Sequence, residues 1–567
     1  MTGKRAKWHT YTPLPDSFLT TAPELPSVLM QCLHNRGLTT IAEMHRFLSG
    51  RYEMGDPFLM KGVADAVTRI RQAIRAGELI AVYGDFDADG VTGTALLTET
   101  FSSLGAQVVP YIPHRVDEGY GLNNGAIKAL ARQGVSLVVT VDCGARALHE
   151  VETARRLGVD VIVTDHHSVQ QQLPEAVAVV NIRREDCPYP FKGLSGVGVA
   201  FKLAQALLLV NEELPLPTQC SSLEEEDLLD LVALGTVADL SPLIGENRSL
   251  VKEGLTQLAH ASRPGMKAMM EKADVTPETV TAATIGYVLG PRLNAAGRMD
   301  HAMLSFRLLT ASSPSHAREL AQLLEEKNRV RREVTTATLD AARLQVEEQE
   351  DQTLLFAAAA DYHEGVLGLA AQRLCDEYYR PAVVTKSGEE ESVSSARSVD
   401  EFDIIAALDE CASLLKRHGG HAKAAGFTVR SENLQDLRSK LSQIATERLA
   451  DMELRPTLDI DAEFPLSELN PEHFHLCQQM EPLGAGNPEP TFLSFGATVR
   501  DWRVVGDRHL KLSLTDGRIV WDAIAFGMGG YAPGLSTRID VVYRPQVRMW
   551  RGQEQLQLKV EDFRPSC

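Results

Sequence analysis

Three aspartates in the segment GDFDADG are the first residues of this sequence whose types and spacing could do chemistry. Asp85, Asp87 and Asp89 stand at alternate positions of a loop that directly follows the apolar segment 79–84. An EF-hand calcium loop does not fit, because no glutamate stands at the twelfth position and the loop follows a strand-like segment. Taken alone, the loop is equally compatible with a solvated turn and with a catalytic metal site.

Further acids and two adjacent histidines follow later apolar segments. Asp142 comes after one of them, and Asp165, His166 and His167 come after the next. If these segments are strands of one parallel sheet, the side chains meet at a common edge, where their like charges repel unless cations neutralise them. A metal site is therefore the simplest interpretation. Asp239 ends a later apolar stretch and is the remaining carboxylate candidate, although by itself it is typical of a helix-terminal acid.

The donor types indicate which metal such a site would take. Carboxylates and imidazoles without cysteine suit manganese or magnesium, the imidazole favours manganese, and zinc is the alternative. Two such ions about 3.5 to 4 Å apart can clamp the attacking and leaving oxygens of a phosphodiester and turn water into hydroxide near neutral pH. We therefore expect two ions and phosphoester hydrolysis.

The apolar segments predict the elements that must position these residues. β-branched, apolar runs without alternation, separated by segments long enough for a helix, are typical of a parallel sheet covered by helices on both faces. In such a sheet ligands bind at the carboxyl ends of the strands. Here GDFDADG, PHR, DCG, DHH and NIRR follow the five runs in turn. The predicted strands are residues 79–84, 107–112, 136–141, 159–164 and 177–181.

The later part of the chain has three different patterns. Residues 190–310 are expected to be mostly helical, and 315–349, which contains neither glycine nor proline, predicts one long helix. An α/β pattern then restarts, with a helix expected over IIAALDECASLLKR (404–417). Short, closely spaced strands over the last hundred or so residues suggest a small β-barrel.

Composition sets the broad class of protein. A chain of 567 residues, with 44% hydrophobic and 23% charged residues, predicts an ordinary soluble protein of three or four domains. We expect a cytoplasmic protein without a membrane segment, because no apolar run approaches about 18 residues and the start lacks a secretory core. The eight cysteines form no CxxC pair, which fits a reducing compartment and argues against structural zinc.

The charge balance does not exclude a nucleic-acid partner. The formal net charge is -19 at pH 7, whereas phosphate binders usually carry a basic surface. Residues 500–551, however, contain nine Lys or Arg against five Asp and no Glu. The C-terminal part is therefore locally basic.

The ordered set of motifs resembles a known family. GDFDADG, VDCG, TDHHS and GTVADLSPLIGENR resemble the four motifs of the DHH phosphoesterases. YIPHRVDEGYGLN, GPRLNAAGRM, RHGGHAKAAGF and EPLGAGNPEPTF narrow the resemblance, over nearly the whole chain, to the RecJ family of single-stranded-DNA-specific exonucleases. The implied α/β fold has an N-terminal segment (1–55), a DHH catalytic domain with a helical extension (56–314), a connecting helix (315–350), a DHHA1 domain (351–450) and an OB-fold barrel (455–567).

The resemblance also implies roles for the residues at the strand ends. His167 would face the scissile phosphate, and Asp165 would orient the histidine pair, as carboxylates commonly do for ligand imidazoles. In the related family II pyrophosphatases a histidine ligand stands at the position of Tyr83. Either one metal subsite is weaker in this chain or Asp85 fills the gap. The implied metal ligands are Asp87, Asp89, Asp142, His166 and Asp239.

Four residues of the predicted catalytic domain are candidates for substrate contacts. Arg115 stands at the end of the second strand, where a guanidinium is well shaped for a phosphate, with a surface ion pair as the alternative. Arg292, Asn294 and Arg298 lie among glycines and alanines that would let a nucleic-acid strand approach. Helix packing is the alternative there, above all for Asn294.

The two C-terminal domains supply the remaining candidates. By resemblance to DHHA1 domains, Ser395 and Arg397 would hold a terminal 5′ phosphate. The glycines before His421 could turn backbone N–H groups towards a phosphate near Lys423, with a tight turn as the alternative. In the barrel, aromatic residues among arginines are typical of non-specific single-strand binding, and about half of them are expected in the core. Trp550, between two arginines, is the best stacking candidate.

Three functions stay open at this point. The leading one is a metal-dependent exonuclease that degrades single-stranded DNA from 5′ to 3′ in recombination and repair; its polarity and DNA preference come from the resemblance. The alternatives are a DHH-family phosphodiesterase of small nucleotides, nanoRNA or pyrophosphate, and a non-catalytic scaffold that binds single strands. The resemblance also implies a monomer and cooperation with single-strand-binding protein and a helicase.

Overall fold

The computed structural model describes residues 6–349, 353–506, 508–550 and 553–566, without the side chains of 548–550 and 553. The chain forms two compact units, which are described separately. One unit contains Ser49–Glu333 and Glu481–Asn487. The other contains Met1–Leu48, Val334–Met480 and Pro488–Cys567.

A five-stranded parallel sheet organises the first unit, and it confirms the predicted α/β fold. Its strands follow the order β3-β2-β4-β5-β6, and all adjacent pairs are parallel. The five strands match the predicted apolar segments to within a residue or two at each end. They are β2 (Leu79–Gly84), β3 (Gln107–Tyr111), β4 (Val135–Val141), β5 (Asp160–Asp165) and β6 (Ala178–Asn181).

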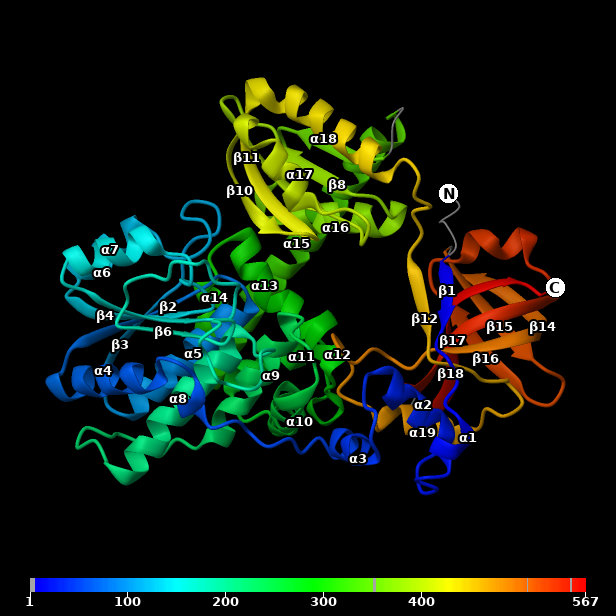
Figure 1. Ribbon diagram of the computed structural model, residues 1–567, viewed down its shortest axis with the longest axis horizontal. Coiled ribbons are helices and arrows are strands. Elements are labelled where there is room, and N and C mark those ends of the chain that lie inside the picture. Colours follow the sequence, from blue (N-terminus) through cyan, green and yellow to red (C-terminus); the bar gives the residue numbers. More distant parts are fainter. Residues whose placement is uncertain (1–5, 350–352, 507, 551–552, 567) are drawn as a thin grey trace. The chain divides into compact units, whose positions relative to one another are not determined.

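Helices cover both faces of this sheet, as Figure 1 shows. Alternate residues of each strand serve two cores: Ile80 and Val82 pack with one set of helices, and Ala81 and Tyr83 with the other. The strands are apolar without alternation for this reason. The first core contains α4 (Val63–Ala76), α5 (Ala88–Ser103) and α8 (Gly196–Glu213), and the second contains α6 (Asn124–Arg132) and α7 (Leu148–Arg156).

The rest of this unit is helical, as predicted for 190–310. The helix α9 (Leu229–Ala238) is buried along its whole length, because its sequence is apolar on every side. The prediction of a long helix over 315–349 is confirmed by α15 (Pro314–Glu347). The other helical elements are α10 (Gly245–His260), α11 (Pro264–Lys272), α12 (Ala282–Thr284), a π-helical turn (Ile285–Leu289), α13 (Gly290–Met299) and α14 (Met303–Leu309).

The second unit contains a mixed sheet in the order β10-β11-β9-β8-β7. The helix predicted over 404–417 is wrong in its second half, since α17 (Ile404–Glu410) ends early and β10 (Leu415–His421) is a strand. Antiparallel pairing of β10 with β11 (Ala424–Arg430) overrides the helical tendency of LLKR. The other elements are β7 (Leu355–Ala359), α16 (Leu367–Tyr378), β8 (Ala382–Lys386), β9 (Glu391–Arg397) and α18 (Leu434–Leu449).

The C-terminal residues form the predicted barrel. Its order is β13-β14-β15-β16-β18-β17, and an additional β14–β17 pairing closes it. The strands are β13 (Ala462–Glu463), β14 (Phe492–Val505), β15 (His509–Thr515), β16 (Val520–Ala525), β17 (Arg538–Trp550) and β18 (Gln553–Pro565), with α19 (Pro471–Gln478) after β13.

The N-terminal residues fold with the barrel unit. The strand β1 (Lys7–Thr10) pairs in parallel with β12 (Thr457–Ile460), and the side chain of Asn35 donates to Asp461. The helices of this segment are α1 (Asp16–Leu19), α2 (Ser27–Asn35) and α3 (Ile41–Ser49). Composition and pattern indicated no partner for this segment, because the pairing joins opposite ends of the chain.

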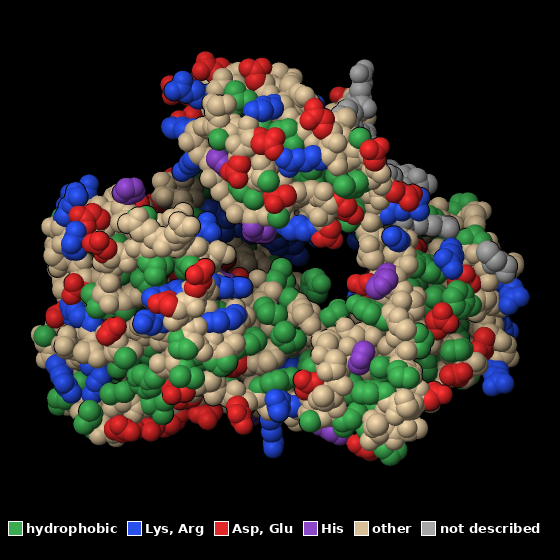
Figure 2. Space-filling model, viewed as in Figure 1, with side chains coloured by type: hydrophobic (Ala, Val, Ile, Leu, Met, Phe, Trp, Pro, Cys, Tyr) green, Lys and Arg blue, Asp and Glu red, His purple; other side chains and the backbone are tan. Residues whose placement is uncertain are grey.

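Two surface properties bear on function. Figure 2 shows acidic and basic side chains interspersed on the face in view, so the net charge of -19 does not make that face uniformly acidic. Among the described residues, no helix is long and apolar enough to cross a membrane.

Candidate metal centre

The loop after β2 presents the three aspartates of GDFDADG. Asp87 is the N-cap of α5, and its Oδ1 accepts hydrogen bonds from the backbone N–H groups of Asp89 (3.0 Å) and Gly90 (3.1 Å). A Cβ on Gly90 would lie 2.5 Å from the backbone oxygen of Asp85, so only glycine fits this tight turn. The turn buries Asp85 and Asp89 at the sheet edge.

The N-terminus of α8 holds Asp89. Its two carboxylate oxygens accept hydrogen bonds from the backbone N–H groups of Gly196 (2.6 Å) and Val197 (2.7 Å). Helix N-termini stabilise anions, which is why a buried carboxylate is tolerated here. A Cβ on Gly196 would lie 2.5 Å from the Cβ of Asp142. The sequence analysis did not predict the contact between Asp89 and the N-terminus of α8. The pattern SGVG, in which Ser195 is the N-cap, could have indicated that a helix begins there.

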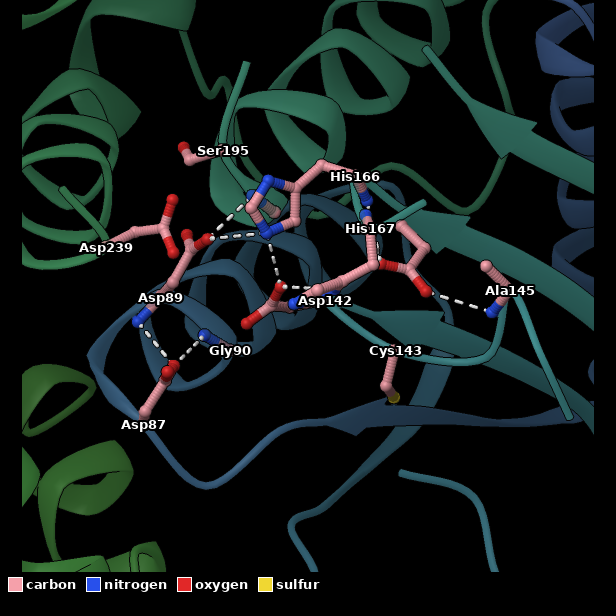
Figure 3. A network of polar contacts seen from close by, with 12 residues as sticks. Asp87, Asp89, Gly90, Asp142, Cys143, Ala145, His166, His167, Ser195 and Asp239 are labelled. Carbon is pink, nitrogen blue, oxygen red and sulfur yellow. Dashed lines mark hydrogen bonds and ion pairs between the residues drawn. The ribbon is translucent and has the colours of Figure 1, made fainter. Parts of the chain in front are cut away.

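The ends of β4 and β5 bring the histidines to the same place. Nε2 of His166 lies 3.0 Å from Oδ1 of Asp142 and 3.8 Å from Oδ2 of Asp89. Both carboxylate oxygens of Asp165 accept hydrogen bonds. Oδ1 accepts from the backbone N–H groups of His166 and His167 and lies 2.8 Å from Nδ1 of the His167 ring. Oδ2 accepts from the backbone N–H group of Ala145 (2.9 Å). Asp165 therefore fixes the histidine pair. Figure 3 shows His166 and His167 next to Asp142.

Asp239 completes the cluster from the C-terminal end of α9. Its Oδ2 accepts a hydrogen bond from Ser241 Oγ (2.6 Å), and in Figure 3 its carboxylate faces Asp89. Three overlapping sets of potential ligand atoms result, and the atoms within each set lie within 4.8 Å of one another. These sets are Asp142 with His166 and His167, Asp89 with His166 and Asp239, and Asp85 with Asp87 and Asp142.

The cluster fits bound cations. Oδ1 of Asp85 is buried without a hydrogen-bond partner among the described residues, and so are Oδ1 of Asp142 and Nε2 of His166, which lie 3.0 Å apart as an ion-pair contact without forming a hydrogen bond. Buried polar atoms normally have partners, and a cation would satisfy all three. Because Asp142 and His166 each belong to two sets, the arrangement suits two neighbouring ions with shared ligands.

The pKa values of the clustered side chains also indicate that the cluster suits bound cations. Burial, followed by the neighbouring aspartates, raises the pKa of Asp85, Asp89 and Asp142 well above the usual range. Burial raises the pKa of Asp239 to about 7 and lowers that of His166 to about 4, so the His166 imidazole is neutral near pH 7 and could bind a cation. A bound cation would stabilise the ionised carboxylates.

Asp165 and His167 form a separate pair. Burial opposes ionisation of Asp165, but the hydrogen bond with His167 and the backbone N–H groups outweigh it and lower its pKa. Burial likewise lowers the pKa of His167, but Asp165 outweighs this effect and raises it. Asp165 therefore favours the protonated form of His167, while the His167 side chain stays half exposed.

Tyr83 lies away from the potential ligands. It is buried in the core beneath α6, and its hydroxyl donates to the backbone oxygen of Gly121 (2.9 Å). Asp85, by contrast, belongs to one of the three ligand sets. This placement favours the alternative in which Asp85 takes the place of the histidine ligand that stands at the position of Tyr83 in the family II pyrophosphatases.

Arg115 lies beside the loop of the GDFDADG segment (84–90), called the metal loop below. Its guanidinium carbon lies 3.9 Å from the centre of the Phe86 ring, and the negative charges of Asp85 and Asp87 act on it. Burial lowers its pKa, and its Nε has no hydrogen-bond partner among the described residues. The electrostatic influence of Asp85 and Asp87 places the side chain near the cluster.

The α13 candidates are partly engaged with the protein itself. Oδ1 of Asn294 accepts from Ala88 N–H (2.8 Å), and Nε of Arg292 donates to Glu325 (2.7 Å). A Cβ on Gly297 would lie 2.6 Å from the backbone oxygen of Phe86, so the small residues pack α13 against the metal loop. Arg298 stands in the last turn of the helix.

The candidates of the second unit lie on one sheet, except for Lys423, which stands in the turn between β10 and β11. Ser395 and Arg397 are alternate residues of β9, and a Cβ on Gly368 would lie 2.9 Å from the Arg397 guanidinium. The glycines before His421 stand in β10, and the exposed His421 ends this strand. Lys423 is ion-paired with Asp400.

The aromatic residues that lie among arginines in the barrel sequence are Trp502, Trp521, Tyr543 and Trp550, and two of them belong to the barrel core. Trp521 and Tyr543 are buried, whereas Trp502 is 45% exposed. The side chain of Trp550 lies outside the described residues, as do those of the arginines beside it.

Together, the parallel sheet with its acid and histidine edge, the second α/β domain and the barrel define a DHH phosphoesterase. Family models agree: the DHH family N-terminal domain matches residues 79–236, the DHHA1 domain 351–447 and the RecJ OB domain 460–562. The chain belongs to the RecJ family of single-stranded-DNA-specific exonucleases.

Two proteins and one solved structure illustrate the relationship. RecJ of Bacillus subtilis is 37% identical, over 99% of this chain and 71% of that protein. RecJ of Dickeya dadantii is 35% identical, over 98% and 97%. The crystal structure of Thermus thermophilus RecJ in complex with Mn2+ has a TM-score of 0.84 and 29% identity, over 99% of this chain and 80% of that one.

Proposed function

We propose that this protein is a metal-dependent exonuclease that hydrolyses single-stranded DNA from 5′ to 3′ in recombination and repair. The observation that carries the proposal is the set of converging carboxylate and imidazole atoms at the carboxyl edge of the sheet, three of which are buried without a hydrogen bond within the described part of the chain. The cations would be Mn2+ or Mg2+, two in number, because oxygen and imidazole donors without sulfur suit these ions. Similar RecJ structures from Thermus thermophilus contain Mn2+ or Mg2+.

The residues at the strand ends have two proposed roles, metal binding and contact with the scissile phosphate. Bound cations supply Lewis acidity and lower the pKa of water at the phosphodiester. Asp165 keeps the proton of His167 on Nδ1, which leaves Nε2 and a partial positive charge for the scissile phosphate. The proposed metal ligands are Asp87, Asp89, Asp142, His166 and Asp239, with Asp85 as an additional carboxylate.

The remaining candidates would bind the DNA strand. Arg115 would contact a phosphate near the cleaved bond, and Ser395 with Arg397 would hold the terminal 5′ phosphate. The others proposed to contact the strand are Arg292, Asn294, Arg298, His421, Lys423 and Trp550. In this division the metal chemistry belongs to residues 56–314, the 5′ end to 351–450 and general strand binding to 455–567.

The test compares substrates in Mn2+. A 5′-labelled single strand should be degraded much faster than the matching duplex, and a strand blocked at its 5′ end should resist. Equal rates on single strand and duplex would contradict the proposal. A series from dinucleotides to long strands separates it from the alternative of a small-nucleotide phosphodiesterase, which would prefer the shortest members.

The biological setting is a finer part of the proposal. The enzyme would act as a monomer together with single-strand-binding protein and a helicase, because a strand must be separated from its complement before it can be degraded. We place it in the cytoplasm, where unpaired cysteines stay reduced. Co-sedimentation of the purified proteins would test the partners and the oligomeric state together.

A further inference from the structure

A short loop from the C-terminal part of the chain folds with the catalytic unit. Residues Glu481–Asn487 lie within the stretch 460–562 that matches the RecJ OB domain model. They nevertheless group with Ser49–Glu333, while the residues on both sides of them belong to the other unit. The loop is therefore an inserted part of the catalytic unit.

Hydrogen bonds fix this loop to the segment after α9. Leu243 N–H donates to the backbone oxygen of Ala485 (2.7 Å). The fully buried guanidinium of Arg248 donates to the backbone oxygens of Glu481 (2.7 Å) and Pro482 (3.3 Å). A buried guanidinium is costly unless its N–H groups find acceptors, so these two carbonyl groups help to stabilise Arg248 and tie the loop to it.

The loop is also packed closely against the same segment. A Cβ on Gly484 would lie 2.8 Å from Cδ1 of Leu243, which is itself buried. Asn487 is buried and donates to the backbone oxygen of Pro482 (2.8 Å), which closes the loop on itself. The loop therefore forms a rigid surface for Leu243.

The segment that the loop holds carries Asp239. Directly after Asp239, Leu240 has a φ of +62°, in the left-handed region that favours glycine. Its side chain is 74% exposed, so packing of that side chain does not hold the turn. A strained turn persists only where its surroundings hold it. Here Ser241 bonds back to Asp239, and Leu243 is anchored by the loop.

We infer that Glu481–Asn487 is a positioning element of the metal centre. By anchoring Leu243 and Arg248, it holds the turn that aims the carboxylate of Asp239 at Asp89 and His166. This inference rests on the proposed role of Asp239 as a metal ligand. One consequence is that a chain cut near residue 455 loses part of its metal centre together with its barrel.

The test uses the full-length chain with Gly484→Val. The valine methyl groups would meet Leu243 and push the loop away, whereas Gly530→Val is a matched control because nothing lies within 4 Å of that position. Mn2+ binding is measured by calorimetry in the absence of DNA. In Gly484→Val the affinity of one Mn2+ should fall by about tenfold or more, the size expected when a support of a ligand is removed. The control should bind like the wild type.

A double variant shows whether the effect passes through Asp239. In an Asp239→Asn background, Gly484→Val should cause no further loss of Mn2+ affinity. If Asp239→Asn weakens binding but Gly484→Val does not, the inference is overturned. If Asp239→Asn binds Mn2+ like the wild type, the ligand assignment fails and the inference fails with it. Should Gly484→Val not fold, Gly484→Ala intrudes less and is judged by the same comparison.

Discussion

Replacing Asp165 by asparagine tests the geometry of the metal centre most directly. The carboxylate accepts three backbone hydrogen bonds and one from the His167 ring. An amide offers only one oxygen, so its NH2 group must face a backbone N–H group. The least costly orientation keeps the oxygen towards the histidines and turns the NH2 group towards Ala145.

The cost follows from that orientation. One buried N–H group loses its acceptor, which costs about 1 to 3 kcal/mol, and the loss of charge weakens the other bonds. The amide oxygen still accepts a hydrogen bond from the His167 ring, but the negative charge of Asp165 that raises the pKa of His167 is lost. We expect Asp165→Asn to lower Mn2+ affinity or kcat by about 10- to 100-fold.

The assay measures thermal unfolding, Mn2+ affinity by calorimetry and kcat on a 5′-labelled single strand. The control is Asp160→Asn, at the other end of the same strand β5, where the exposed carboxylate bonds only to Arg69 among the described residues. That change should alter stability by no more than about 0.5 kcal/mol and leave activity intact. If Asp165→Asn behaves like this control in both Mn2+ affinity and kcat, the orienting role is refuted.

Three further outcomes are expected. Asp142→Asn should abolish hydrolysis while binding of a single strand, measured by fluorescence anisotropy, stays within about twofold; retained hydrolysis would favour a site elsewhere. Gly90→Ala should lower activity at least tenfold or so, because the new Cβ would lie 2.5 Å from the Asp85 backbone oxygen; wild-type kinetics would contradict the tight turn. Mn2+ affinity of the metal-free protein should weaken as the pH falls through about 7, because Asp239 binds a proton that the metal must displace; a pH-independent calorimetric titration would contradict this.

The structure confirms the parts of the fold that depend on local pattern. All five strands of the catalytic sheet could be predicted from the sequence, because burial on both faces requires an uninterrupted apolar run. The helix α15 could be predicted because its segment contains apolar residues near helical spacing and no glycine or internal proline. The helix predicted over 404–417 was wrong because β10 gains a partner, β11, that local propensity does not include. Likewise, Trp521 and Tyr543 resemble Trp502 in sequence, and only the folded barrel distinguishes core from surface.

The sequence by itself determined the sheet, the types of side chain at its carboxyl edge and hence the kind of metal they suit. Parallel strands necessarily end side by side, so residues that follow them can be placed without coordinates. Only the tertiary structure decided how each acid is held. The α8 N–H groups that bind Asp89 come from 107 residues away, and the loop that supports Asp239 comes from the C-terminal part of the chain. Such contacts depend on how whole elements pack, which no local pattern records.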